Sequence, residues 1–202
     1  MRHRVLRSLA VAGAAAAALL MAAPAGTASA APAAATALKG GTTTVTTGPG
    51  IAGTLLRNGV LPLATAPGRQ SFGYDRGLTT SFSFPVTGGA VDLGTLAGTI
   101  EHRGGITFYN LRNGKRLSVS DFVIDTRTGT LTGRVNRTAT RVPVFTLDLS
   151  AATVSAQGSK VAVGNIDVRL TAVAAGALNQ SLGTSVFAGG LDLGTARTTL
   201  RV

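Results

Sequence analysis

Apolar and polar side chains alternate with period two along short segments of this chain, and turn sequences separate those segments. Residues 78–86 place Phe82 and Phe84 on one side of the chain and Ser81 and Ser83 on the other. Alternation of this kind, rich in aromatic and β-branched residues, predicts a half-buried strand. Similar segments recur from about residue 42 to the C-terminus, which predicts an all-β fold.

Two turn sequences organise the centre of the chain. Asn113-Gly114 precedes residues 117–124, and Asn-Gly is a strong hairpin signal because both residues tolerate positive φ. Arg103-Gly104-Gly105, between residues 96–102 and 106–111, predicts a second hairpin. Further strands are expected at residues 42–47, 130–135, 142–149, 153–155, 161–170 and 191–202. About ten strands at this spacing are typical of a sandwich or a closed sheet. We expect an antiparallel two-sheet β-sandwich.

One short C-terminal helix is expected at residues 172–181. Thr171 is placed to cap its first turn, and Gly183 is suited to end it. Its apolar stripe is expected to lie against the sheet: Val173, Leu178 and Leu182. The pattern also allows a shorter helical turn at residues 51–56.

The N-terminus has the order of a signal peptide. Three arginines, Arg2, Arg4 and Arg7, precede an apolar run that ends before Pro24. Ala28-Ser29-Ala30 offers a small-x-small cleavage site, and the run is shorter than the roughly 20 residues that a spanning helix needs. We therefore expect a signal peptide at residues 1–30, a flexible spacer at 31–40 and one domain at 41–202. No transmembrane segment is expected in the mature chain, and the predicted location is extracellular, either secreted or associated with the cell wall.

The charge balance is basic, but the basic residues are dispersed. Of 19 Lys and Arg, three lie in the predicted leader, and 8 Asp and Glu oppose the rest, which leaves a mature net charge of +8. The densest stretch, Arg112 to Arg116, is predicted to be a hairpin tip without the aromatic platform that single-strand binders use. We therefore expect no nucleic-acid partner, and we expect weak attraction to anionic cell-wall polymers.

The residues that carry chemistry are few. The chain has no cysteine, and His102 is the one histidine of the mature part. There is no Gly-x-Ser-x-Gly nucleophile elbow, and a zinc site would lack imidazole and thiolate ligands. We therefore expect no enzymatic activity, no catalytic residues and no metal site.

The face of the strand on which His102 lies depends on the predicted hairpin. A three-residue loop places His102 with Ile100 and Phe108, and leaves Tyr109 on the opposite face. A two-residue loop aligns His102 with Thr107 and Tyr109 instead. A histidine near a strand end can also be an ordinary half-buried polar residue.

Two segments resemble a known family. Residues 81–89, with Phe84-Pro85, and residues 96–106, with His102 before Gly104-Gly105, resemble the secreted HtaA-type haem-binding domain of bacterial haem uptake. Glycine-rich positions between Leu170 and Thr195 are similar to its C-terminal part. The resemblance implies a two-sheet β-sandwich with a short helix.

The same resemblance implies haem bound by a tyrosinate, with a histidine hydrogen-bonded to that tyrosine. His102 occupies the matching histidine position. The segment that should carry the tyrosine, residues 50–63, contains no aromatic residue, so Tyr74 and Tyr109 are the tyrosines available. The first hypothesis is an exported, non-enzymatic binding domain for haem or another hydrophobic ligand. The alternative is a structural or adhesive module associated with the cell wall.

Overall fold

The computed structural model describes residues 35–202, so the predicted signal peptide and the first residues of the predicted spacer lie outside the described part. Strands dominate, as predicted. They are β1 (Thr36–Ala37), β2 (Gly40–Thr47), β3 (Val60–Thr65), β4 (Arg69–Tyr74), β5 (Leu78–Val91), β6 (Gly98–His102), β7 (Gly105–Asn110), β8 (Arg116–Asp125), β9 (Thr130–Val135), β10 (Arg141–Asp148), β11 (Thr153–Gln157), β12 (Lys160–Leu170) and β13 (Asp192–Arg201). The two helices are α1 (Ile51–Arg57) and α2 (Ala172–Leu182).

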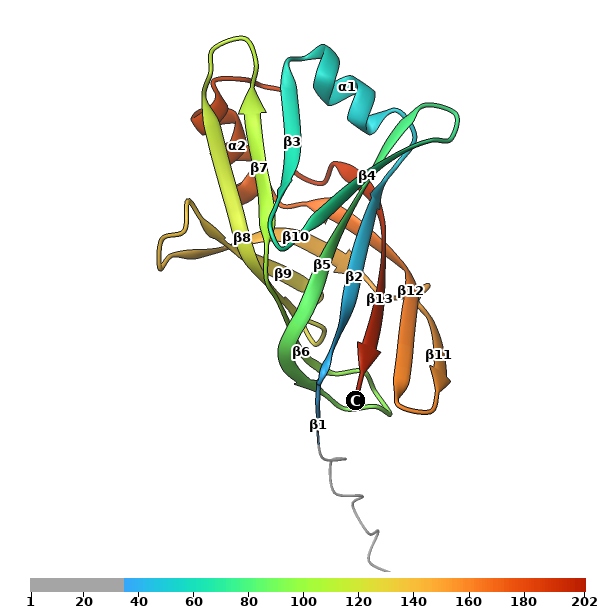
Figure 1. Ribbon diagram of the computed structural model, residues 1–202. Helices are drawn as coiled ribbons and strands as arrows, with labels where there is room; N and C mark the ends of the chain where they lie inside the picture. Colours follow the sequence, from blue (N-terminus) through green and yellow to red (C-terminus); the bar gives the residue numbers. More distant parts are fainter. Residues whose placement is uncertain (1–34) are drawn as a thin grey trace, which may run out of the picture. The chain divides into compact units, whose positions relative to one another are not determined.

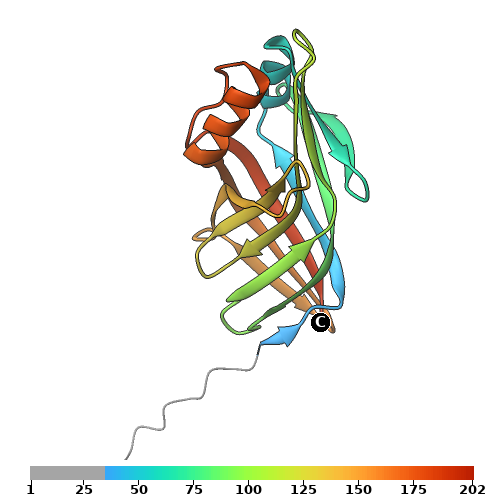
Figure 2. The same ribbon diagram turned by 90° about the vertical axis from the view of Figure 1, so that its left-hand side faces the viewer.

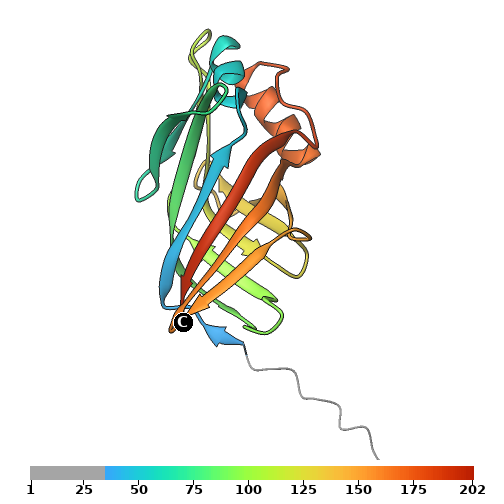
Figure 3. The ribbon, with the colours of Figure 1, turned by 90° about the vertical axis from the view of Figure 1, so that its right-hand side faces the viewer.

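Strand pairing closes eight antiparallel strands into one barrel, in the order β5, β2, β13, β12, β10, β9, β8 and β6, with β6 paired to β5 again (Figures 1 and 3). The all-β antiparallel prediction is confirmed, but the expected pair of separate sheets is corrected to a continuous ring. The physical reason is that long strands change partner along their length. At Asp121, with a φ of 53°, a bulge lets β8 pair with β7 before it and with β6 after it.

The predicted hairpin at residues 103–105 is wrong. β6 and β7 are two parts of one interrupted strand, and both pair with β8. A Cβ at Gly104 would lie 2.6 Å from the backbone nitrogen of Gly68, and one at Gly105 would lie 2.3 Å from the carbonyl oxygen of Val119. The two glycines therefore allow backbones to approach closely and do not form a turn. The Asn113-Gly114 hairpin between β7 and β8 is confirmed.

The barrel is not closed by strand pairing at its upper end. There β7 continues upward with β3 on its free edge, whereas β5 continues with β4, and the two diverge beneath α1 (Figure 1). The side chain of Gln70 spans this seam. Its Oε1 accepts a hydrogen bond from the backbone N–H of Ala64 (3.0 Å), and its Nε2 donates to the carbonyl oxygen of Pro62 (3.2 Å). One side chain thus replaces part of the missing ladder between β3 and β4.

The C-terminal helix forms where predicted. Thr171 caps α2 by accepting a hydrogen bond from the N–H of Ala174 at 3.0 Å, and Gly183 ends it with a φ of 64°. α2 packs against β10, β8 and β7 on the inner side of the upper strands (Figure 2). The expected apolar stripe is corrected at Val173, which is exposed. The buried positions of α2 are Ala174, Ala175, Leu178 and Leu182. Neither helix within residues 35–202 has the length and apolar character needed to traverse a membrane.

The described part of the predicted spacer, residues 35–40, includes ordered elements. β1 pairs with the end of β5, and the side chain of Leu38 is buried in the core. Leu38 also donates a backbone hydrogen bond to Gly89 at 3.0 Å. The described fold therefore includes residues before Gly41.

Candidate functional site

An apolar cavity of about 70 Å³ lies inside the barrel, below α1 and α2. Six of the chain's seven phenylalanines line it: Phe82, Phe84, Phe108, Phe122, Phe145 and Phe187. They come from β5, β7, β8, β10 and the segment after α2, so the folded ring gathers residues that are far apart in sequence. Two pairs meet edge to face, with ring centroids 5.1 Å and 6.0 Å apart.

His102 is the one titratable residue in the cavity wall, and it points inward from the end of β6. Its Nδ1 lies 3.3 Å from the carbonyl oxygen of Phe122, which can only accept, so Nδ1 carries the proton. Its Nε2 therefore accepts from the hydroxyl of Thr43 at 2.7 Å. Because the Thr43 proton is used in this way, Thr43 accepts in turn from Thr198 at 2.9 Å. The network joins β6, β8, β2 and β13.

His102 is held in its neutral form. Burial disfavours the imidazolium and lowers the pKa of His102 from 6.5 to about 4, although the hydrogen bond to the Phe122 carbonyl partly opposes that shift. A protonated Nε2 could no longer accept from Thr43. At neutral pH the residue is thus an uncharged polar group whose two nitrogens both have partners.

The structure does not bring the three residues named from the sequence together. His102 shares the inner face with Ile100, Ile106 and Phe108. These side chains therefore face as the alternative with a three-residue loop predicted, although no hairpin forms there. Tyr109 points to the outer face of β7, where it lines a surface depression. Tyr74 lies next to the tip of the β4–β5 hairpin with 84% of its surface exposed.

Sequence reasoning missed the partners of His102 and the seam residue. Thr43 lies in the run Thr42-Thr43-Thr44, where period two shows that alternate threonines face inward but not which set does. Thr198 pairs with Thr43 only because β13 lies beside β2 in the ring. Gln70 lies in β4, a strand that was not predicted because Pro67 and Gly68, directly before it, indicate a turn. No pattern in the sequence identifies Gln70.

With this geometry in view, the chain can be compared with known proteins. The HtaA family model, described as Htaa, matches residues 31–182. The chain belongs to the HtaA family. No curated protein sequence matches it.

Three solved structures from Corynebacterium glutamicum are similar. The C-terminal domain of HtaA has a TM-score of 0.54 at 16% identity, with 83% of this chain and 99% of that chain covered, which shows the shared fold. A domain-swapped dimer variant of that domain has a TM-score of 0.48 at 18% identity (74% and 89% covered). The haem-binding protein HtaB has a TM-score of 0.42 at 11% identity (83% and 96% covered).

Haem is the ligand that the sequence resemblance implies, and the interior of this HtaA domain can be compared with what haem requires. Pockets for drug-sized ligands measure roughly 300–1,000 Å³, far more than this cavity. Within residues 35–202 every buried side-chain nitrogen and oxygen has a hydrogen-bond partner, so none is held free for iron. Nor does any group of three or more His, Cys, Asp or Glu side chains in that part gather to hold a metal. The residues around His102 do not fit a haem held by a tyrosinate with a histidine partner.

Proposed function

We propose that this HtaA domain is an exported, non-enzymatic binding domain that holds a small apolar ligand inside its barrel. The observation that carries the proposal is the cavity lined by six phenylalanines, beside a seam that Gln70 bridges with two hydrogen bonds. Interior positions of a barrel are normally filled by side chains or by one small ligand. An apolar cavity that side chains leave unfilled favours an apolar occupant.

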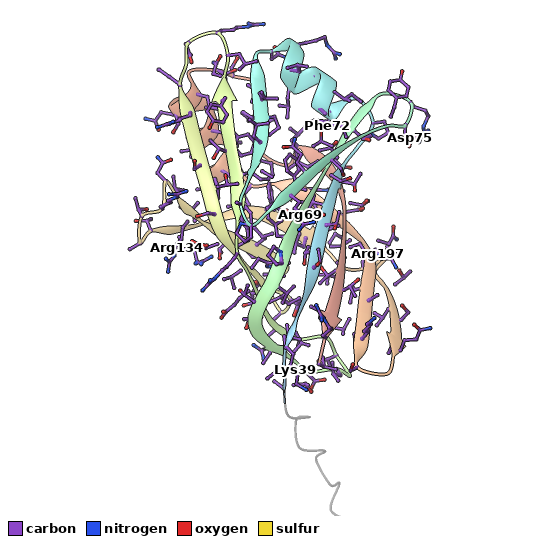
Figure 4. All side chains as sticks on the ribbon, viewed as in Figure 1. Lys39, Arg69, Phe72, Asp75, Arg134 and Arg197 are labelled. Carbon is purple, nitrogen blue, oxygen red and sulfur yellow. The ribbon has the colours of Figure 1, made fainter. Side chains whose placement is uncertain are left out.

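The seam supplies a route to the cavity. Pro62 lines the cavity from β3, and its carbonyl is one of the two groups that Gln70 holds. Phe72 lies two residues from Gln70 on the same face of β4, below α1, and its ring is exposed (Figure 4). Phe72 therefore gives the seam an exposed apolar side chain beside Gln70, as expected for the entrance of an apolar molecule.

The polar groups of the wall favour a ligand without strong polar atoms. The neutral His102 and Thr43 already use the hydrogen bonds that their network needs, and the wall holds no charged or amide side chain. The hydroxyl of Thr47 accepts from the N–H of Thr80 at 2.9 Å, so a ligand oxygen placed there would have at most the Thr47 proton to replace its bonds to water. The cavity suits a few carbon atoms or the apolar end of a larger molecule.

Xenon is a suitable probe, because it binds an engineered apolar cavity of about 150 Å³ and a single xenon atom is small enough for the cavity of about 70 Å³ here. We expect saturable shifts of the cavity methyl signals in heteronuclear spectra. Leu55→Phe, which adds a ring at the α1 side of the cavity, should weaken probe binding about ten-fold or more, whereas Leu63→Phe on the outer face should not change it. Near-UV circular dichroism checks that both variants fold. Absence of binding, or equal binding by a folded Leu55→Phe variant, would rule the proposal out.

Haemin distinguishes this proposal from haem binding through tyrosine. We expect no shift of the Soret band when haemin is added to the protein. A Soret shift that disappears in the Tyr74→Phe, Tyr109→Phe double variant would contradict the proposal and establish tyrosine ligation.

Export is tested separately: the protein recovered from culture medium should begin at Ala31, and an unprocessed chain found only in the cytosol would contradict it.

A further inference from the structure

The outer face of β3, β7 and β8 carries a second candidate site, distinct from the cavity. Figure 1 shows these strands side by side, with α2 behind them. A depression of about 750 Å³ opens on this face. Its lining includes Leu63, Thr107, Tyr109, Arg116, Ser118 and Arg137. It contains two arginines and no carboxylate.

Strand register fixes the arrangement of these side chains. Tyr109 lies opposite Arg116 on the neighbouring strand, so the phenol and the guanidinium share one face. Thr107 lies opposite Ser118, and their hydroxyls are 2.8 Å apart; the hydroxyl of Thr65, which lies diagonally across on β3, is 3.0 Å from that of Thr107. This hydroxyl ladder gives the floor of the depression three linked hydroxyl groups.

Arg137 lies at the depression because hydrogen bonds to β8 fix the loop that carries it. The N–H of Asn136 donates to the carbonyl of Ser118 at 2.8 Å, and Oδ1 of Asn136 accepts from the N–H of Ser118 at 3.1 Å. Asn136 and Arg137 both have left-handed backbone conformations, with φ of 48° and 60°. A non-glycine residue rarely adopts this conformation, and here the two hydrogen bonds to β8 maintain it.

In the described part of the chain, Arg116 and Arg137 have no acidic partner. Within residues 35–202 the one ion pair joins Arg76 and Asp75 at the β4–β5 tip. Arg116 and Arg137 therefore present guanidinium groups that suit phosphate or carboxylate oxygens. Tyr109 and Leu63 offer apolar surface beside them, and the hydroxyl ladder offers hydrogen bonds to a hydroxylated chain.

We propose that this depression binds a hydroxylated polyanion, a short stretch of polysaccharide or polyol polymer with phosphate or carboxylate groups. Two separated arginines match two anionic groups of a repeating chain. The apolar faces of a sugar or polyol pack on Tyr109 and Leu63. Nucleic acid fits less well because the depression holds one aromatic ring, whereas single-strand grooves stack successive bases on several.

The test uses the full secreted chain and three polymers: poly(glycerol phosphate), polygalacturonate and neutral dextran. Calorimetric titration should show binding of at least one anionic polymer, weakened by salt, and none of dextran. Whether phosphate or carboxylate is preferred identifies the source of the anionic group. Dextran binding as strong as that of both anionic polymers, or no binding of either, overturns the proposal.

Matched variants distinguish binding at a defined site from diffuse electrostatic attraction. Arg116→Gln with Arg137→Gln should weaken binding about ten-fold or more, and Tyr109→Ala should weaken it about three-fold or more. The control, Arg127→Gln with Arg201→Gln, removes the same charge elsewhere and should retain the affinity of the unmodified chain. Equal losses in the two double variants would show diffuse attraction and overturn the site. Equal affinity for a single-stranded oligonucleotide would also overturn the assignment.

Discussion

His102 lies where a neutral imidazole is stable and a charged one is not. The Phe122 carbonyl fixes the proton on Nδ1, and the Thr43 hydroxyl occupies Nε2. Removing either partner would leave a buried polar atom unsatisfied, which costs about 1–3 kcal/mol. In this chain the histidine therefore ties strands together, and its bonds reach a threonine rather than a tyrosine.

The pH dependence of stability should report this environment. The pKa of His102 is about 4 in the folded state, against 6.5 for an unperturbed histidine, so the unfolded chain binds a proton first as the pH falls. The free energy of unfolding should decrease from pH 6.5 toward pH 4, by at most about 3 kcal/mol, and the contribution of His102 should be fully present above pH 6.5. Urea titrations at pH 7.0 and pH 4.5 measure the difference.

Two aspartates define the lower limit of that measurement. The pKa of Asp92 lies below 3.8 because its carboxylate accepts hydrogen bonds from the backbone N–H groups of Thr95 and Gly94. The pKa of Asp148 lies below 3.8 because its carboxylate accepts hydrogen bonds from Ser150. Their contribution to stability is lost as the pH falls through this lower range, below the window of His102.

A His102→Gln variant should be less stable at pH 7.0 and should lose most of the decrease in the free energy of unfolding between pH 7.0 and pH 4.5. An unchanged decrease in that variant would assign the effect to other groups.

The seam between β3 and β4 has no strand ladder. Gln70 supplies two hydrogen bonds where a ladder would supply more, and both go to the backbone of β3. Local opening should therefore begin here, because regions with few backbone bonds open most readily.

Gln70→Ala tests this view. The substitution frees the Ala64 N–H and the Pro62 carbonyl, and should lower the free energy of unfolding by about 1 kcal/mol. Hydrogen exchange at Ala64 should accelerate, and xenon should enter the cavity faster at similar affinity. Gln180→Ala on the exposed side of α2 serves as the control and should change neither rate. Equal exchange at Ala64 in both variants would contradict a role for Gln70 in closing the seam.

The elements also show which sequence signals were informative. The Phe82 and Phe84 alternation identified β5, and Thr171 with Gly183 marked both ends of α2. Gly104-Gly105 misled because glycine serves both turns and close backbone contacts, and a single sequence does not separate the two. β3 was missed because Pro62 argues against a central strand, yet proline is tolerated at an edge, and β3 is an edge strand.

For the whole molecule, closure of the ring could not be predicted from the strands alone. β2 and β13 lie side by side although about 150 residues separate them, and nothing in either segment specifies that pairing. The same long-range pairing makes the His102 network, since Thr43 and Thr198 come from these two strands. The sequence therefore predicted strand content, an inward alternative for His102 and a closed sheet as one of two architectures, but not the order of strands in the ring or the partners of the histidine.

A proline substitution should destabilise the protein more in a strand of the closed ring than in a strand that pairs on one side only. β13 pairs on both sides, with β2 and β12, whereas β11 pairs with β12 alone and is fully exposed. Thr199→Pro removes a backbone donor from β13 and should cost about 3 kcal/mol or more, with loss of the near-UV signal of the whole barrel. Val154→Pro in β11 should cost about 1 kcal/mol or less. Thermal unfolding compares the two variants, and equal destabilisation would show that the ring is no more cooperative than its appendages.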